Sequence, residues 1–144
     1  MRDVPEVGPA GARLIEQMED GPMARILVVD DEEQVRSLLR EILESEGHAV
    51  GEAANGAEAM FLARTAAWDL VIIDIIMPVK EGLETTLELR REFPALKIVA
   101  ISGGGRLAPQ GYLDTAEVVG ADRTLMKPIP RENLLAVVTD LLVG

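Results

Sequence analysis

Five polar side chains stand at or near the ends of apolar segments: Asp30, Asp31, Asp74, Ser102 and Lys127. Carboxylates are the ligands that hard divalent cations such as Mg²⁺ prefer. A lysine ammonium is a point charge suited to a phosphoryl group, and a serine hydroxyl adds a hydrogen-bond donor. Together these groups predict Mg²⁺-dependent phosphoryl transfer with a carboxylate as nucleophile.

The nucleophile in this interpretation is Asp74, which interrupts the apolar run Val71-Ile-Ile-Asp-Ile-Ile76. An unpaired carboxylate in a buried strand costs free energy, so its presence points to a site. Asp31 has a second interpretation as the N-cap of a helix, with Gln34 as a partner three residues on. Lys127 alone is equally compatible with an ordinary surface lysine.

Two hydrophobic periods alternate along the chain after residue 22 and predict the elements that carry these groups. Helices are expected from the stripe Val35 to Leu43, from Asn55-Gly56, over Gly82–Phe93 and Tyr112–Val119, and after Pro130. The expected strands are Arg25–Val29, Ala49–Ala53, Asp69–Ile75, Lys97–Ile101 and Asp122–Met126.

Strands that are apolar on both faces and alternate with helices indicate an α/β fold with a parallel sheet covered on both sides. Right-handed crossovers make it an open, doubly wound sheet of five strands with five helices. Ligands bind outside the carboxyl ends of the strands in such sheets. The five polar side chains follow those ends, so we expect them to converge at one edge.

Composition narrows the function further. The chain has 144 residues, a hydrophobic content of 48%, a formal net charge of −11 and no cysteine. This excludes a wholly disordered chain, disulfide frameworks and thiolate metal sites, and it disfavours direct nucleic-acid binding, which relies on basic residues. The longest apolar stretch, Leu70 to Val79, is too short to span a bilayer and contains Asp74. A cytoplasmic protein without membrane contact is expected.

The domain organisation follows from a change in composition at residue 23. Residues 1–22 contain six Gly and Pro residues and are predicted to form a flexible N-terminal extension; residues 23–144 form the domain. After Pro128 only 16 residues remain, enough for the last helix, so no DNA-binding effector is expected; a piece of a longer protein stays an alternative.

Four sequence motifs in order carry a family resemblance: Ile26-Leu-Val-Val-Asp-Asp31, Asp74-Ile-Ile-Met-Pro78 with Gly82, Ile101-Ser102, and Gly120-Ala-Asp122 followed by Lys127-Pro128. Over about residues 24–143 the chain resembles the receiver domain of bacterial two-component response regulators, of the CheY-like superfamily. The resemblance implies a flavodoxin-like sheet with strand order 2-1-3-4-5.

The resemblance also implies a role for each matching residue. Asp74 would accept the phosphoryl group from a kinase phosphohistidine, and Lys127 and Ser102 would contact it. Mg²⁺ would be held by Asp30, Asp31, Asp74 and the backbone carbonyl of Ile76, with Asp30 acting largely through a metal-bound water. The family often has a cis peptide bond at the position of Lys127-Pro128.

Three features depart from the family pattern. Thr124 stands where an aromatic switch residue is usual, Ser102 is followed by Gly103-Gly-Gly105, and the segment from Ser102 to Gly120 is about three residues longer than usual. A rearranging glycine loop, with Tyr112 as the replacement aromatic residue, is therefore expected to carry the output. Neither Ile76 nor Gly104, at the positions that tune phosphate lifetime in the family, can orient a water, so dephosphorylation is expected to be slow.

The leading hypothesis is a single-domain response regulator: a phosphoacceptor signalling domain, not an enzyme acting on other molecules. Its partners would be a sensor histidine kinase or a histidine phosphotransfer protein, and a downstream protein target; a homodimer stays open. One alternative is a degenerate receiver that acts as a binding module without switching. Another is a phosphohydrolase of the haloacid dehalogenase type, which would need a second acid where Ile76 stands. The only histidine, His48, is interpreted as a solvated turn residue.

Overall fold

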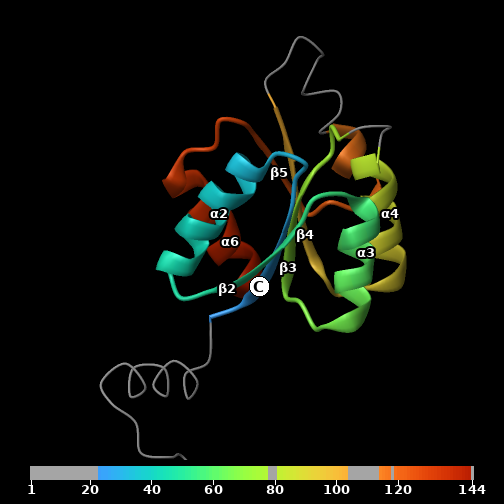
Figure 1. The fold of residues 1–144 in the computed structure, drawn as a ribbon, viewed down its shortest axis with the longest axis horizontal. Helices are drawn as coiled ribbons and strands as arrows, with labels where there is room; N and C mark the ends of the chain where they lie inside the picture. The colour runs from blue at the N-terminus through green and yellow to red at the C-terminus, as the bar shows by residue number, and fades with distance from the viewer. Residues whose placement is uncertain (1–22, 78–80, 104–113, 118, 144) are drawn as a thin grey trace, which may run out of the picture.

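The computed structural model describes residues 23–77, 81–103, 114–117 and 119–143. Five strands form one parallel sheet in the order β2-β1-β3-β4-β5, as predicted (Figure 1). Their bounds are β1 Arg25–Val29, β2 Ala49–Ala53, β3 Leu70–Asp74, β4 Lys97–Ser102 and β5 Arg123–Met126. The observed bounds differ from the predicted ones by at most one residue at either end.

Helices cover both faces of the sheet. Helices α2 (Glu33–Ser45) and α6 (Arg131–Val143) lie on one side, and α3 (Gly56–Thr65) and α4 (Glu81–Glu92) lie on the other (Figure 1). Residues 114–117 are also helical, within the predicted helix Tyr112–Val119, whose remaining residues lie partly outside the described part of the chain. No helix of the described ranges is long and apolar enough to cross a membrane.

The core consists of two apolar layers separated by the sheet. Leu27, Val71 and Ile73 face α3 and α4, whereas Ile26 and Ile72 face α2 and α6. All five residues of β3 are buried, in keeping with its continuous β-branched run. A parallel strand covered on both faces is expected to show such a run.

The start of α2 differs from the prediction. Its N-cap residue is Glu32, without a side-chain cap, so Asp31 is not the N-cap and forms no capping box with Gln34. Asp30 takes the preceding turn, because its Oδ1 accepts a hydrogen bond from the Glu32 backbone N–H at 2.8 Å. Leu38 of the predicted apolar stripe is 55% exposed, so the buried stripe is narrower than predicted.

The prediction of a solvated His48 is wrong. Its side chain is buried at 7% exposure, and Nδ1 has no hydrogen-bond partner within the described residues. The turn is closed tightly by Gly47 at φ +94° and by the His48 backbone N–H, which donates to Leu43 O at 3.2 Å. Because the turn at Gly47 is short, the His48 imidazole packs against the domain and is shielded from water.

Candidate functional site

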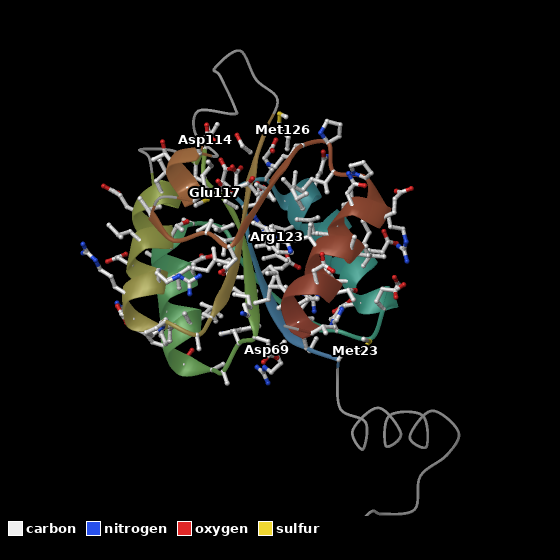
Figure 2. The ribbon with its side chains drawn as sticks, turned by 180° about the vertical axis from the view of Figure 1, so that it is seen from behind. Met23, Asp69, Asp114, Glu117, Arg123 and Met126 are labelled. Atoms are coloured by element: carbon white, nitrogen blue, oxygen red, sulfur yellow. The ribbon has the colours of Figure 1, made fainter. Side chains whose placement is uncertain are left out.

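The carboxyl ends of four strands place the predicted polar groups at one edge. Asp30 follows β1, Asp74 is the last residue of β3, Ser102 is the last residue of β4, and Lys127 follows β5. Asp30, Asp74 and Ser102 are buried. This edge is the one marked by Met126, the last residue of β5, in Figure 2.

Lys127 lies between two carboxylates from different strands. Its Nζ is 2.7 Å from Asp30 Oδ2 and 3.1 Å from Asp74 Oδ2. A third carboxylate, that of the exposed Glu32, lies 3.6 Å away. Burial, the largest single influence, lowers the pKa of Lys127, but the hydrogen bonds and charges of Asp30 and Asp74 outweigh it and the pKa is raised. The lysine is therefore a permanent positive charge at the edge.

The Asp74 carboxylate is held from two directions. Its Oδ1 accepts a hydrogen bond from the Ile76 backbone N–H at 2.8 Å, while Oδ2 faces Lys127. Burial raises the pKa of Asp74 to about 6, although the Ile76 N–H and Lys127 act in the opposite direction and Asp30 adds to the rise. At neutral pH the group is mostly ionised, which a nucleophile requires.

Three carboxylates lie close enough to share one cation. One oxygen each from Asp30, Asp31 and Asp74 lie within 4.8 Å of one another, and Asp31 is the exposed member. A set of oxygen donors of this kind suits Mg²⁺, which commonly uses one or two carboxylates together with water. The single ammonium of Lys127 leaves the negative charge of these carboxylates in excess, so a divalent cation fits the site.

Arg36 of α2 is a residue of the site that the sequence did not predict. Its Nη1 donates to the backbone carbonyl of Asp30 at 2.7 Å, and its Nε donates to Glu52 Oε1 of β2 at 3.0 Å. Arg36 thereby ties the turn that carries Asp30 and Asp31 to the neighbouring strand. The signal in the sequence is weak, because an arginine on a polar helix face is usually solvated.

Gly82 packs the first turn of α4 against the end of β3. A Cβ atom here would overlap the backbone carbonyl oxygen of Asp74 and the Cα of Ile75. Only glycine permits so close an approach of two backbones. The position of Asp74 therefore depends on a residue eight positions later in the chain.

The remaining predicted residues are placed as follows. The Ser102 hydroxyl makes a long hydrogen bond to Gly103 O at 3.4 Å, and the Ser102 carbonyl accepts from the Lys127 backbone N–H at 2.7 Å. The Lys127–Pro128 peptide bond is cis. Thr124 is half-buried in β5. Gly104, Gly105 and Tyr112 lie outside the described residues.

Comparison with known proteins agrees with this arrangement. The pattern of the response regulator receiver domain matches residues 26–139. The chain belongs to this family. Receiver domains are signalling domains of two-component systems, so the fold and the phosphorelay class are those the sequence motifs predicted.

Individual relatives support the assignment over most of the chain. The chemotaxis protein CheY of Halobacterium salinarum is 35% identical over 120 residues, which cover 83% of this chain and 98% of the relative. The transcriptional regulatory protein ResD of Bacillus subtilis is 38% identical over 123 residues, and this receiver spans 49% of its length. A CheY-like receiver domain from Methanospirillum hungatei superimposes with a TM-score of 0.75 at 29% identity, covering 83% of this chain and 93% of that structure.

Proposed function

We propose that this receiver accepts a phosphoryl group on Asp74 from the phosphohistidine of a sensor histidine kinase or phosphotransfer protein. A carboxylate oxygen of Asp74 forms the new P–O bond, the P–N bond of the phosphohistidine breaks, and the imidazole nitrogen keeps the electron pair. The observation that carries the proposal is the buried Asp74 carboxylate, 3.1 Å from the Lys127 ammonium and within an acidic cluster.

Asp30, Asp31 and Asp74, with the backbone carbonyl of Ile76, would hold Mg²⁺. When bound, the cation neutralises charge on the phosphoryl oxygens and on the carboxylates. The donor set supports this assignment, because the three carboxylates lie within 4.8 Å of one another and, among the described residues, Lys127 is the basic side chain paired with them.

The protein's own groups orient the acceptor and receive the transferred charge. The Ile76 N–H fixes Oδ1 of Asp74, so the carboxylate is oriented before a donor arrives. Lys127, already ion-paired to Asp74, would move its contact to a phosphoryl oxygen. Among the described residues, the Ser102 hydroxyl has the 3.4 Å contact to Gly103 O to lose, and it would donate to another phosphoryl oxygen.

Signalling would follow as a change in protein–protein contacts with a downstream target in the cytoplasm, without direct contact with nucleic acid or membrane. The acidic composition supports the exclusion of nucleic acid, because phosphate neutralisation supplies most of such affinity.

The test is intact mass after incubation with Mg²⁺ and a small phosphodonor. We expect the mass to increase by one phosphoryl group. This increase should not occur when Mg²⁺ is chelated before the donor is added, and it should not occur in Asp74→Ala. The matched control is Asp140→Ala, which removes an exposed carboxylate paired with Arg123 at 3.5 Å and should retain the addition. Modification of Asp74→Ala to the same extent would contradict the proposal.

A second candidate is a receiver that binds a partner without switching. Thr124, at the position where the family usually has an aromatic residue, favours it. Beryllofluoride with Mg²⁺ mimics a phosphoryl group, so amide resonances around Ser102 should shift in a switching receiver. If neither beryllofluoride nor a phosphodonor changes the protein, the non-switching module is the better description.

A further inference from the structure

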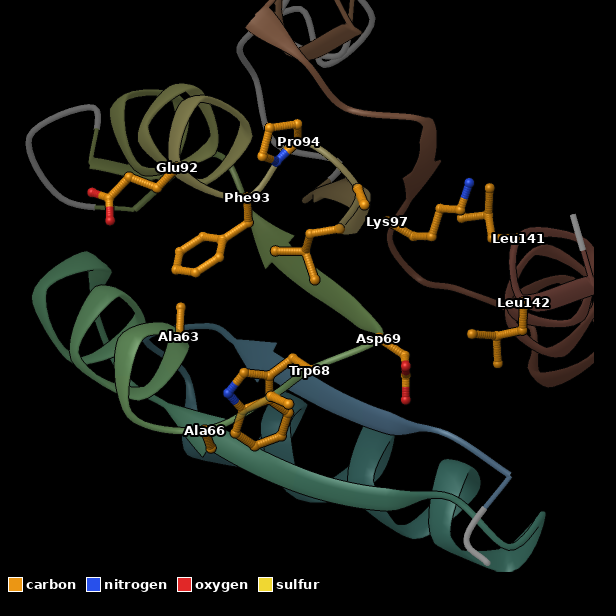
Figure 3. A pocket seen from close by; sticks show the side chains of 13 residues that line it. Ala63, Ala66, Trp68, Asp69, Glu92, Phe93, Pro94, Lys97, Leu141 and Leu142 are labelled. Carbon is orange, nitrogen blue, oxygen red and sulfur yellow. The ribbon is translucent and has the colours of Figure 1, made fainter.

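A groove of about 620 Å³ lies far from the phosphoacceptor edge, at the amino ends of β3 and β4. It is lined mainly by apolar side chains from three segments: Ala66 and Trp68 after α3, Phe93 and Lys97 after α4, and Leu141 and Leu142 of α6. Trp68 and Phe93 are the two aromatic residues that line it (Figure 3). Its volume is within the range of about 300–1,000 Å³ that encloses ligands or several apolar side chains.

The amino-terminal segment joins the domain beside this groove. Met23 and Asp69 lie at the same end of the molecule, opposite Met126 (Figure 2). The backbone N–H of Arg25 donates to Oδ2 of Asp69, a groove residue, at 2.8 Å. Met23, the first described residue, therefore lies at the same end of the sheet as the groove.

The sequence of that segment contains one apolar cluster, Leu14, Ile15 and Met18, in an otherwise polar and Gly/Pro-rich stretch. Ile15 precedes Met23 by eight residues, which span at most about 29 Å when extended. Arg25, two residues after Met23, contacts Asp69 and Trp68, so the cluster can reach this side of the groove without unfolding the domain.

The groove is lined by charged side chains of both signs: Lys97, Asp69 and Glu92, of which Glu92 is paired with Arg64. Two basic side chains are available to an acidic segment: Lys97, and Arg25, whose guanidinium lies 5.2 Å from the centre of the Trp68 ring. Neither basic side chain takes part in a salt bridge among the described residues. Residues 1–22 carry five acidic and two basic side chains; Glu16 lies within the apolar cluster, Glu19 follows it and Arg13 precedes it.

We propose that Leu14–Met18 docks into this groove of its own chain, with Leu14 and Ile15 packed against Trp68 and Phe93. A short tether gives an effective concentration on the order of millimolar, so a weak intrinsic affinity is enough for substantial occupancy. The groove is lined by none of the phosphoacceptor residues, so this inference is independent of the proposed function.

Trp68 is the only tryptophan in the chain and therefore reports directly on the groove. In the full chain, Leu14→Asp/Ile15→Asp should shift Trp68 emission to longer wavelength and raise its acrylamide quenching constant. The matched control Val4→Asp/Val7→Asp adds the same charge outside the cluster and should change neither. Equal emission and quenching in wild type and Leu14→Asp/Ile15→Asp would overturn the proposal.

Two further measurements identify the segment that occupies the groove. Lys97→Glu should raise quenching in the wild-type background and add little to Leu14→Asp/Ile15→Asp, because the tail is then already released. Quenching measured at 1 and 100 μM on wild type should be the same for an intramolecular contact. Protection that appears only at the higher concentration would assign the groove to a second copy and overturn the proposal.

Discussion

Lys127 is one ammonium shared by two buried carboxylates, at 2.7 Å from Asp30 and 3.1 Å from Asp74. A buried charge is tolerated only when it is paired and hydrogen-bonded. Within the described ranges, each carboxylate also accepts one backbone N–H: that of Glu32 for Asp30 and that of Ile76 for Asp74. In the folded protein these two carboxylates and one ammonium carry a net negative charge. This charge favours cation binding, and the repulsion between the carboxylates destabilises the folded state.

The first prediction concerns Lys127→Met. Without the ammonium, two adjacent carboxylates remain buried, and removing one partner of a buried pair should cost about 3 kcal/mol of unfolding free energy. Urea unfolding at pH 7.5 without divalent cation measures this loss. Addition of Mg²⁺ should recover part of it, because the cation replaces some of the missing positive charge.

The control for this variant is Arg123→Met. Arg123 pairs with Asp140 at 3.5 Å on the surface, where both side chains are well exposed. Such a pair is worth at most about 1 kcal/mol. Equal losses in Lys127→Met and Arg123→Met would contradict the assignment of a buried ion-pair network at the phosphoacceptor edge.

The second prediction is a pH dependence from His48. Burial lowers the pKa of His48 below its usual value, with Glu46 acting weakly in the opposite direction. The neutral ring is therefore the form that folds, so stability is complete above the unfolded-state pKa of about 6.5 and falls as pH decreases below it. The loss is at most about 1.4 kcal/mol per pH unit.

The measurement is the unfolding free energy at pH 7.5 and pH 5.5 in wild type and in His48→Leu. Because carboxylates elsewhere titrate equally in both proteins, the difference between them isolates the histidine. Wild type should lose more stability than His48→Leu on acidification. A parallel decline in both proteins would show that the His48 ring is free to protonate when folded.

The third prediction concerns Ile76. Its side chain has no polar atom that could orient a water toward a phosphoryl group on Asp74. Phosphorylated protein should therefore lose its phosphoryl group slowly, and Ile76→Asn should shorten the lifetime because its amide can hold a water. Intact mass against time after removal of the donor measures both rates. A wild-type half-life of seconds would contradict this expectation.

At the scale of elements, the contact between α4 and β3 sets the position of the acceptor. The fourth prediction is that Gly82→Ala lowers stability by about 1–3 kcal/mol, as over-packing in a close contact does. It should also slow phosphorylation, because the added methyl overlaps the Asp74 carbonyl and Ile75 Cα. Urea unfolding and the initial rate of mass addition measure the two effects.

Gly103→Ala is the matched control, since a Cβ at Gly103 would meet nothing within 4 Å. Reducing the freedom of the unfolded chain at such a position is neutral or slightly stabilising. If both alanine variants behaved alike, the close approach of α4 to β3 would not be what holds Asp74 in place.

The elements were largely predictable, because β1, β3 and β4 are apolar on both faces and the helical stripes between them are distinct. The convergence of Asp30, Asp74 and Lys127 followed from parallel topology alone. Contacts that depend on side-chain direction were not predictable: Arg36 reaching the Asp30 carbonyl, Asp30 taking the turn expected of Asp31, and the burial of His48. Local spacing does not encode which way a turn residue points.

At the scale of the whole molecule, the two ends of the sheet have different chemistry. The carboxyl end gathers Asp30, Asp31 and Asp74, while the amino end carries a mainly apolar groove whose charged lining residues, Lys97, Asp69 and Glu92, are of both signs. The chain as a whole has a formal charge of −11. Mg²⁺ can therefore stabilise the protein in two ways: by screening the repulsion among all its acidic groups, or by binding at the carboxylate cluster. A test of Mg²⁺ must distinguish the two.

The fifth prediction is that Mg²⁺ stabilises the whole domain. A cation that binds only the folded state adds about 2.7 kcal/mol at a concentration of 100 times its Kd. Asp31→Asn should lose most of this gain, because it removes one of three clustered carboxylates, yet it should fold normally since Asp31 is exposed. Thermal unfolding with MgCl₂, and with NaCl at equal ionic strength, separates binding from screening. An equal gain from both salts would mean that the cluster attracts cations only as part of an acidic surface.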